Sequence, residues 1–278
     1  MLDDANVLAM KTGMLHDEAT IRTVASTLRK YYKDEIPRLV CDPVCVSASG
    51  YALLMDGALG SLIDEILPLA TLVTPNKSEA ERILSHKRKN VTISSLADMV
   101  SNSKEILNLG PKAVLLKGGH VKTTMGEVNE LLARDPGVSV HKYGLLDEDM
   151  NILQVRSSEG DRTPQFVVDV LQDSTSEPGG GLKTSIFIRP RIEPTSTHGT
   201  GCTLSAAIAC GLANGLTSNP SICLPLFETN RGLFSTGSGS RWDDLHSLGN
   251  SSRFPCWCRL RSVKPHPLGG FENRAPVR

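Results

Sequence analysis

Several features that would assign this chain to a class of protein are scarce or missing from its sequence. No apolar run is long enough to cross a bilayer, and residues 1–4 do not resemble the start of a secretory signal. Basic and acidic residues number 30 each, and aromatic residues make up only 4%, so neither a basic surface nor a stacking platform is indicated. We therefore expect neither nucleic acid nor a membrane among its partners.

The cysteines do not form a recognisable framework. There are seven of them, an odd number, scattered along 278 residues. Such a distribution favours free thiols in a reducing compartment, and hence a cytoplasmic location. Cys256 and Cys258 lie too close together and too far from other ligands for a zinc site.

Short apolar segments alternate with helical patterns over the first 120 residues. Strands are expected over residues 6–10, 39–43, 70–74 and 113–117. Helices are expected over residues 17–32, 56–67 and 94–109, and from Asn76 onward. This alternation is typical of βαβ units and predicts an α/β fold with a mainly parallel sheet.

Polar residues follow these strands. They are residues 11–14, Asp42, residues 74–76 and residues 117–119. The carboxyl ends of parallel strands meet at one edge of the sheet, which is where such folds bind ligands. Asp42 and Glu79 are candidates to hold Mg²⁺, because hard cations prefer oxygen ligands. Lys117 is a candidate phosphate contact.

Each of these residues also has an ordinary structural explanation. Asp42 could cap the turn that follows it. Asn76 could be the N-cap of a helix, with Glu79 closing a capping box. Lys117 could be a solvent-exposed lysine. Their expected position at one shared edge favours a site.

A glycine-rich segment, residues 197–207, leads into an apolar helical run that extends to Gly215. The first N–H groups of a helix lack intrahelical partners and lie at its positive end, so they bind phosphate readily. Gly199 and Gly201 would let the backbone approach an anion closely, and Cys202 would lie in the same positive field. The alternative is an ordinary loop before a core helix.

The pattern loosens in the second half of the chain. We expect an insert near residues 142–183, with a strand over residues 165–171 inside it, and an edge strand over residues 186–191. Residues 217–278 are rich in Ser, Gly, Pro and Arg without periodicity, and are expected to form a low-order tail. Residues 1–216 would then form the folded domain.

Five segments resemble, in the same order, motifs of the hydroxymethylpyrimidine/phosphomethylpyrimidine kinases of thiamine biosynthesis, members of the ribokinase superfamily. They are residues 11–15, residues 42–50, residues 74–80, residues 117–120 and residues 198–207. The resemblance covers residues 6 to about 215 and implies a three-layer αβα fold. Family members carry further strands before the first of these motifs, so the sheet is expected to be incomplete at the N-terminus.

The resemblance also implies an activity: ATP- and Mg²⁺-dependent phosphorylation of hydroxymethylpyrimidine and then of its monophosphate, to the diphosphate. By motif, the substrate would contact Met14 and Val44, and the metal would be held by Asp42 and Glu79. The nucleotide would contact Asn76, Lys117, Gly118 and Thr200. The anion hole and catalytic group would comprise Gly199, Thr200, Gly201 and Cys202.

Two alternatives stay open at this point. One is an inactive fragment, or a remnant that binds phosphate without catalysis, and the other is a pyridoxal or pyridoxamine kinase. The expected partner is a small-molecule substrate, and a homodimer is left open. The Cys202 thiol is a candidate to take the substrate's hydroxyl proton, or it is only a small residue that fits the turn.

Overall fold

The computed structural model describes residues 6–33, 35–45, 53–55, 57–88, 90–119, 121–142, 166–175, 181–190 and 200–216. The chain divides into two units, residues 1–233 and 234–278, and all described residues belong to the first. Residues 217–278, for which a low-order tail is predicted, lie outside the described residues. So do His198, Gly199 and most of the predicted insert.

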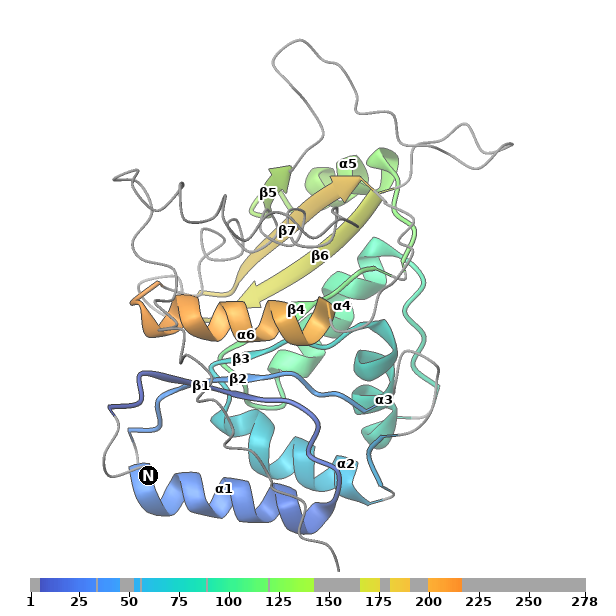
Figure 1. Cartoon of the computed structure of the whole chain (residues 1–278). Coiled ribbons are helices and arrows are strands. Elements are labelled where there is room, and N and C mark those ends of the chain that lie inside the picture. The colour runs from blue at the N-terminus through green and yellow to red at the C-terminus, as the bar shows by residue number, and fades with distance from the viewer. Residues whose placement is uncertain are drawn as a thin grey trace, which may run out of the picture. The chain divides into compact units, whose positions relative to one another are not determined.

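The described strands form one seven-stranded sheet in the order β1-β2-β3-β4-β6-β7-β5 (Figure 1). Their bounds are β1 (Ala9–Thr12), β2 (Arg38–Cys41), β3 (Leu72–Val73), β4 (Ala113–Leu116), β5 (Ser139–Lys142), β6 (Phe166–Asp173) and β7 (Lys183–Pro190). Strands β1 to β4 are parallel, β6 is antiparallel to both β4 and β7, and β5 is parallel to β7. The prediction of a mainly parallel sheet is confirmed.

The helices are α1 (Glu18–Tyr32), α2 (Ala58–Ser61), α3 (Lys77–Lys87), α4 (Leu96–Leu107), α5 (Met125–Arg134) and α6 (Thr200–Ala213). A π-helical turn over Leu62–Ile66 and a 3-10 turn over Leu67–Leu69 continue α2, so the helix expected over residues 56–67 is present in a mixed form. Capping boxes start α3 at Asn76, α4 at Ser95 and α5 at Thr124. These side chains satisfy N–H groups that a helix start leaves unpaired, which is why the helices begin there.

Helices cover both faces of the sheet and complete a three-layer αβα arrangement. Figure 1 shows α6 on one side of β1 and β2, and α1 and α2 on the other side. Strand side chains alternate between two apolar clusters: Cys41 and Val73 face the cluster shared with α1 to α5, whereas Val40 and Leu72 face the cluster under α6. None of the described helices is both long and apolar enough to cross a membrane.

The second half of the sheet differs from the sequence prediction. The strand expected over residues 165–171 is present as β6, but it lies inside the sheet between β4 and β7 rather than in an excursion from it. The prediction that residues 186–191 form an edge strand is wrong, because β7 lies between β6 and β5. Both β5 and α5 were missed.

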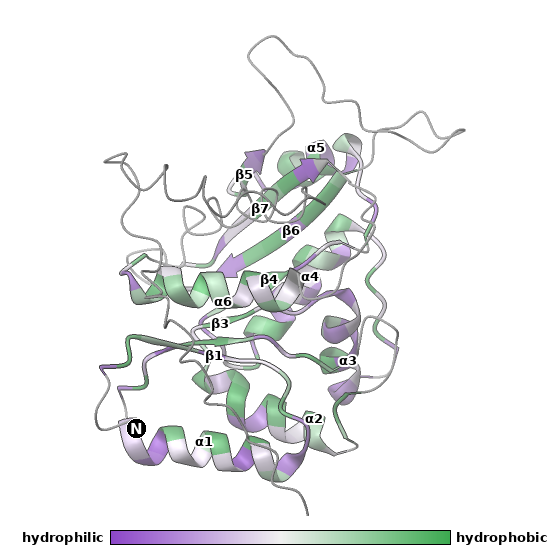
Figure 2. Cartoon of the chain, in the orientation of Figure 1, coloured by the Kyte–Doolittle hydropathy of each residue, from purple (hydrophilic) through white to green (hydrophobic). Residues whose placement is uncertain are grey.

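The misplacement has a physical cause. Every residue of β6 is buried, so both of its faces pack against the protein and its apolar residues lack the alternation of an edge strand (Figure 2). The buried Asp169, Gln172 and Asp173 also interrupt the apolar run. The apolar run therefore predicts a strand here, but it does not show that both faces of the strand are buried or where the strand lies in the sheet.

Candidate active site

Asp42 is the centre of the polar edge of the sheet. It directly follows β2, and its N–H continues the pairing with β1 by donating to the Thr12 carbonyl (3.0 Å). Because Cys41 faces the α1 to α5 side, strand alternation turns the Asp42 side chain toward α6. The residue is 1% exposed, so its carboxylate depends on protein partners.

Those partners come from four other parts of the chain. The Thr74 hydroxyl donates to Asp42 Oδ1 at 3.3 Å, and the Lys117 ammonium donates to the same oxygen at 3.1 Å. The Ser205 hydroxyl, on α6, lies 3.2 Å from Asp42 Oδ2, and Lys11 Nζ, on β1, lies 3.9 Å from it. We call these five residues the Asp42 cluster. Its two ammonium groups compensate the buried carboxylate and leave an excess of positive charge.

Lys117 lies between Asp42 and the start of α6. Its backbone extends β4, because its N–H donates to the Pro75 carbonyl at 2.8 Å. A Cβ added at Gly201 would stand 3.2 Å from Lys117 Nζ, so the ammonium lies close to the α6 backbone. The predicted phosphate contact and the predicted anion-binding turn are therefore neighbours.

The residues predicted to form the anion hole lie inside the helix rather than before it. Thr200, Gly201 and Cys202 form the first turn of α6, where N–H groups have no intrahelical acceptor. Cys202 is exposed, and the Ser205 hydroxyl lies 3.0 Å from its carbonyl oxygen. A hydroxyl has one hydrogen, so Ser205 donates either to Asp42 or to Cys202. Gly199 lies outside the described residues.

Glu79 combines a structural role with an unusual acidity. The capping box considered as an alternative is present: Asn76 N–H donates to Glu79 Oε2 at 2.7 Å, and Glu79 N–H donates to Asn76 Oδ1 at 2.9 Å. Burial raises the pKa of Glu79 to about 7, while the charge of Lys117 opposes this rise and that of Asp42 adds to it. The buried carboxyl therefore holds its proton more tightly than an exposed glutamate does.

Met14 and Val44 follow β1 and β2, which are neighbours in the sheet. Met14 is 52% exposed and Val44 is half-buried. They lie at the same edge as Asp42, where their apolar side chains are accessible to a ligand. Gly118, a predicted nucleotide contact, donates its backbone N–H to Asp169 Oδ1 at 2.8 Å.

Sequence reasoning gave no site role to Lys11, Thr74 or Ser205, although all three lie within the motif segments. Lys11 and Thr74 were expected at the strand ends, but no role was assigned to them there. Ser205 lies one helical turn beyond Gly201, which places it on the same side of α6. Only the packing of α6 on the sheet shows that it reaches Asp42.

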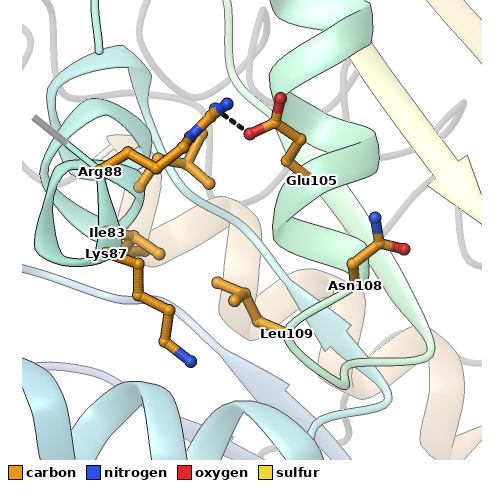
Figure 3. A pocket seen from close by; sticks show the side chains of 7 residues that line it. Ile83, Lys87, Arg88, Glu105, Asn108 and Leu109 are labelled. Atoms are coloured by element: carbon orange, nitrogen blue, oxygen red, sulfur yellow. Dashed lines mark hydrogen bonds and ion pairs between the residues drawn. The ribbon is translucent and has the colours of Figure 1, made fainter. Parts of the chain in front are cut away.

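A surface pocket of about 230 Å³ lies elsewhere, between the C-terminal parts of α3 and α4 (Figure 3). It is lined by Ile83, Leu84, Lys87, Arg88, Glu105, Asn108 and Leu109. An ion pair between Arg88 and Glu105 crosses it. None of the predicted site residues lines this pocket. Within the described ranges, no group of three or more His, Cys, Asp or Glu side chains could hold a metal.

Comparison with known proteins places this arrangement in a family. The family model for phosphomethylpyrimidine kinase matches residues 1–151 and 165–223. The chain belongs to the phosphomethylpyrimidine kinase family. The resemblance drawn from the motifs is thereby confirmed, and the residues left unmatched between the two segments, 152–164, are far fewer than the predicted insert.

Individual relatives agree with this assignment. The hydroxymethylpyrimidine/phosphomethylpyrimidine kinase of Rhizobium meliloti is 34% identical over 216 residues, covering 78% of this chain and 60% of that protein. A crystal structure of phosphomethylpyrimidine kinase from Clostridium difficile aligns with a TM-score of 0.52 and 29% identity, covering 83% of this chain and 71% of that one. The chain thus spans 60% of the length of this relative and 58% of the length of the Streptomyces coelicolor hydroxymethylpyrimidine/phosphomethylpyrimidine kinase, to which it is 33% identical.

A third likeness concerns the fold alone. The pyridoxal kinase of Bacillus subtilis aligns with a TM-score of 0.53 at 24% identity, over 82% of this chain and 64% of that one. The predicted ribokinase-like α/β fold is confirmed by these neighbours.

Proposed function

We propose that this chain binds ATP and transfers its terminal phosphoryl group to the hydroxymethyl group of an aminopyrimidine, and then to the resulting monophosphate. The observation that carries this proposal is the position of Lys117, held by Asp42 beside the first turn of α6. The names of the relatives support the same substrate class. In each transfer the bond between the terminal phosphorus of ATP and its β-phosphate oxygen breaks, and ADP leaves. In the first transfer the new bond forms to the hydroxymethyl oxygen, which gives up its proton. In the second it forms to an anionic oxygen of the monophosphate, and no hydroxyl proton is involved.

Two groups of this chain would stabilise the charge on the moving phosphoryl group. The N–H groups of Thr200, Gly201 and Cys202 would face its oxygens, at the positive end of α6. The Lys117 ammonium would contact the phosphates from the sheet. Because phosphoryl transfer depends mainly on positioning and charge stabilisation, a rigid cluster around Lys117 suits it.

Cys202 would accept the substrate's hydroxyl proton. Its place in the first turn of α6 and its exposed side chain are compatible with contact to a substrate. The alternative is that Cys202 is only a small residue suited to the turn. In that case its backbone N–H contributes to catalysis and its thiol takes no part. Cys202→Ala separates the two possibilities, because it removes the thiol and keeps the backbone N–H.

Asp42 and Glu79 are the carboxylates that would hold Mg²⁺. Their oxygens suit a hard cation that is bound by one or two carboxylates together with water and phosphate. The raised pKa of Glu79 fits this assignment, because Lys117 and the Asn76 N–H offset the burial of its carboxylate only in part, and a cation would offset more of it. When bound, the ion would neutralise charge on the phosphates. Asn76 would hold Glu79 in place through the capping box.

Met14 and Val44 would form an apolar wall against the pyrimidine ring. Their place at the ends of adjacent strands puts this wall at the same edge as the phosphate-binding groups. A cytoplasmic location and a homodimer are parts of the same proposal that rest on the sequence alone.

The proposal is tested by measuring ATP binding calorimetrically and ATP-dependent phosphorylation of hydroxymethylpyrimidine by the purified chain. The parent should bind ATP, and Lys117→Met should weaken binding, whereas Lys87→Met on the surface of α3 should leave it unchanged. A parent chain without affinity for ATP would reject the proposal. Binding without turnover of either hydroxymethylpyrimidine or pyridoxal would favour the non-catalytic remnant, and turnover of pyridoxal alone would favour the pyridoxal kinase alternative.

A further inference from the structure

Asp169 is a charged residue in a place where charge is costly. It lies on β6, inside the sheet, and is 0% exposed. Its partner across the ladder is Phe187, which belongs to the apolar cluster under α6. A buried carboxylate requires both a counter-charge and hydrogen-bond donors.

Both oxygens of Asp169 have short contacts. Oδ2 accepts a hydrogen bond from Arg189 Nη2 on β7 at 2.8 Å, which supplies the counter-charge. Oδ1 accepts from the backbone N–H of Gly118 at 2.8 Å. The second contact crosses from β6 to the loop that carries Lys117, so the carboxylate connects the frame of the sheet to the candidate active site.

Gly118 passes very close to β6. The regular pairing of β4 with β6 ends at Leu116 and Val170. A Cβ added at Gly118 would stand 1.8 Å from the Val168 carbonyl oxygen and 2.9 Å from Met99 Cε. Only glycine fits there without displacing the backbone, and the Asp169 carboxylate then fixes the direction of the Gly118 N–H.

Lys117 is the residue immediately before this fixed point. Its own N–H is bound to Pro75, and its ammonium lies between Asp42 and the α6 backbone. Because both flanking peptide groups are held, the start of the lysine side chain has little freedom. The hydrogen bond to Pro75 restrains the peptide group before the Lys117 side chain, and the hydrogen bond from Gly118 to Asp169 restrains the one after it.

We propose that Asp169 is a positioning residue, which holds Gly118 so that Lys117 faces the phosphates of ATP. The role of ATP rests on the function proposed above, whereas the restraint of the loop does not. Asp169 does not touch the nucleotide in this proposal. It acts through the backbone of the loop and therefore through Lys117.

Two substitutions separate the contacts of Asp169. Asp169→Asn keeps an oxygen for the Gly118 N–H but removes the charge that pairs with Arg189. Asp169→Ala removes both contacts. If Asp169→Ala fails to fold, Asp169→Ser replaces it. The serine hydroxyl is one bond closer to the backbone than the aspartate oxygens and does not reach Gly118. The control is Gln172→Leu, since Gln172 is equally buried on β6 but bonds to Thr184 and Val100 rather than to the loop.

Hydrogen exchange without nucleotide tests the restraint itself. We expect the Gly118 amide to exchange about tenfold faster or more in Asp169→Ala, or in its Ser substitute, because a charge-assisted bond is lost. Asp169→Asn and Gln172→Leu should leave this amide protected, although both should melt at lower temperature. Equal protection of the Gly118 amide in the parent and in Asp169→Ala would overturn the proposal.

ATP affinity tests the consequence. Asp169→Ala should weaken calorimetric ATP binding about tenfold, and Asp169→Asn should weaken it far less. In a Lys117→Met background the same substitution should have no further effect, because its route to the phosphates is already removed. Additive effects of the two substitutions would overturn the proposal. A parent chain that binds no ATP rejects the proposed function, and the exchange measurement then decides the restraint alone.

Discussion

The two halves of the sheet are built differently and contribute differently to the candidate site. Strands β1 to β4 are parallel, have two to four residues each, and are followed at one edge by Asp42, Thr74 and Lys117. Strands β6 and β7 are antiparallel to each other, have eight residues each, and bring only Asp169 to the site, through a backbone contact. The parallel half carries the side chains of the candidate site, and the antiparallel half forms a buried frame beside them.

The largest effect on stability is expected when the carboxylate at the centre of the Asp42 cluster is removed. Asp42→Ala leaves Lys117 and Lys11 without their counter-charge beside the positive end of α6. We expect the free energy of unfolding to fall by about 3 kcal/mol, as for a buried ion pair that loses one partner. Urea denaturation measures this. Asp64→Asn, which removes an exposed carboxylate paired with Lys87, should change stability by less than about 0.5 kcal/mol. Equal effects of the two substitutions would show that the cluster has no special role.

Cys202→Ala should show whether the thiol in the first turn of α6 takes part in catalysis or only in packing. Cys202→Ala keeps the first turn of α6 and its N–H groups but removes the thiol. If the thiol is the general base, kcat at saturating ATP should fall about 10²-fold or more, and Cys202→Asp should recover part of the rate. A Cys202→Ala variant with the parent's kcat and a lower melting temperature would assign the thiol a structural role only.

The protonation of Glu79 should make the stability of this half depend on pH. Folding raises the pKa of Glu79 from 4.5 to about 7, because the carboxyl is buried. The folded chain therefore binds this proton more tightly, so the contribution is complete below pH 4.5 and is lost as pH rises through 7. Between pH 5 and pH 8 we expect the parent to lose about 2–3 kcal/mol relative to Glu79→Gln.

Glu79→Gln keeps an oxygen that can accept the Asn76 N–H, so the capping box is not the variable in this comparison. Urea denaturation of both proteins at the two pH values gives the difference. Parallel curves for parent and variant across this pH range would mean that the pKa of Glu79 is close to its ordinary value.

A substitution on β6 that leaves Asp169 in place should affect stability and not binding. Val170 is fully buried on β6, and Val170→Ala should lower the free energy of unfolding by about 2 kcal/mol through lost apolar burial and a small cavity. Its side chain faces the cluster of α1 to α5, away from α6. We therefore expect ATP affinity to stay within twofold of the parent. A larger loss of affinity would show that the packing of β6 on the α1 to α5 side also influences ATP binding.

The sequence predicted much of the parallel half because its signals are local. The strands ending near Asp42, Thr74 and Lys117, the helix after Asn76 and the helix after the glycine-rich segment all follow from apolar runs broken by Pro, Gly or capping residues. The motifs identified the family. In the antiparallel half the sequence predicts strands over residues 165–171 and 186–191 but not their order. Because β6 is buried on both faces and carries polar residues, neither its place in the sheet nor that of β7 could be predicted.

By itself, the sequence determined the α/β class, the parallel edge and the residue types that gather there, because strand ends and helix caps depend on near neighbours. Only the tertiary structure decided which of these residues touch. Ser205 reaches Asp42 across 163 positions of the chain, and Asp169 reaches Gly118 across 51. Such contacts depend on how α6 packs on the sheet and on the order of β4 and β6, which are set by the burial of two apolar faces at once. No local pattern in a single sequence specifies that order.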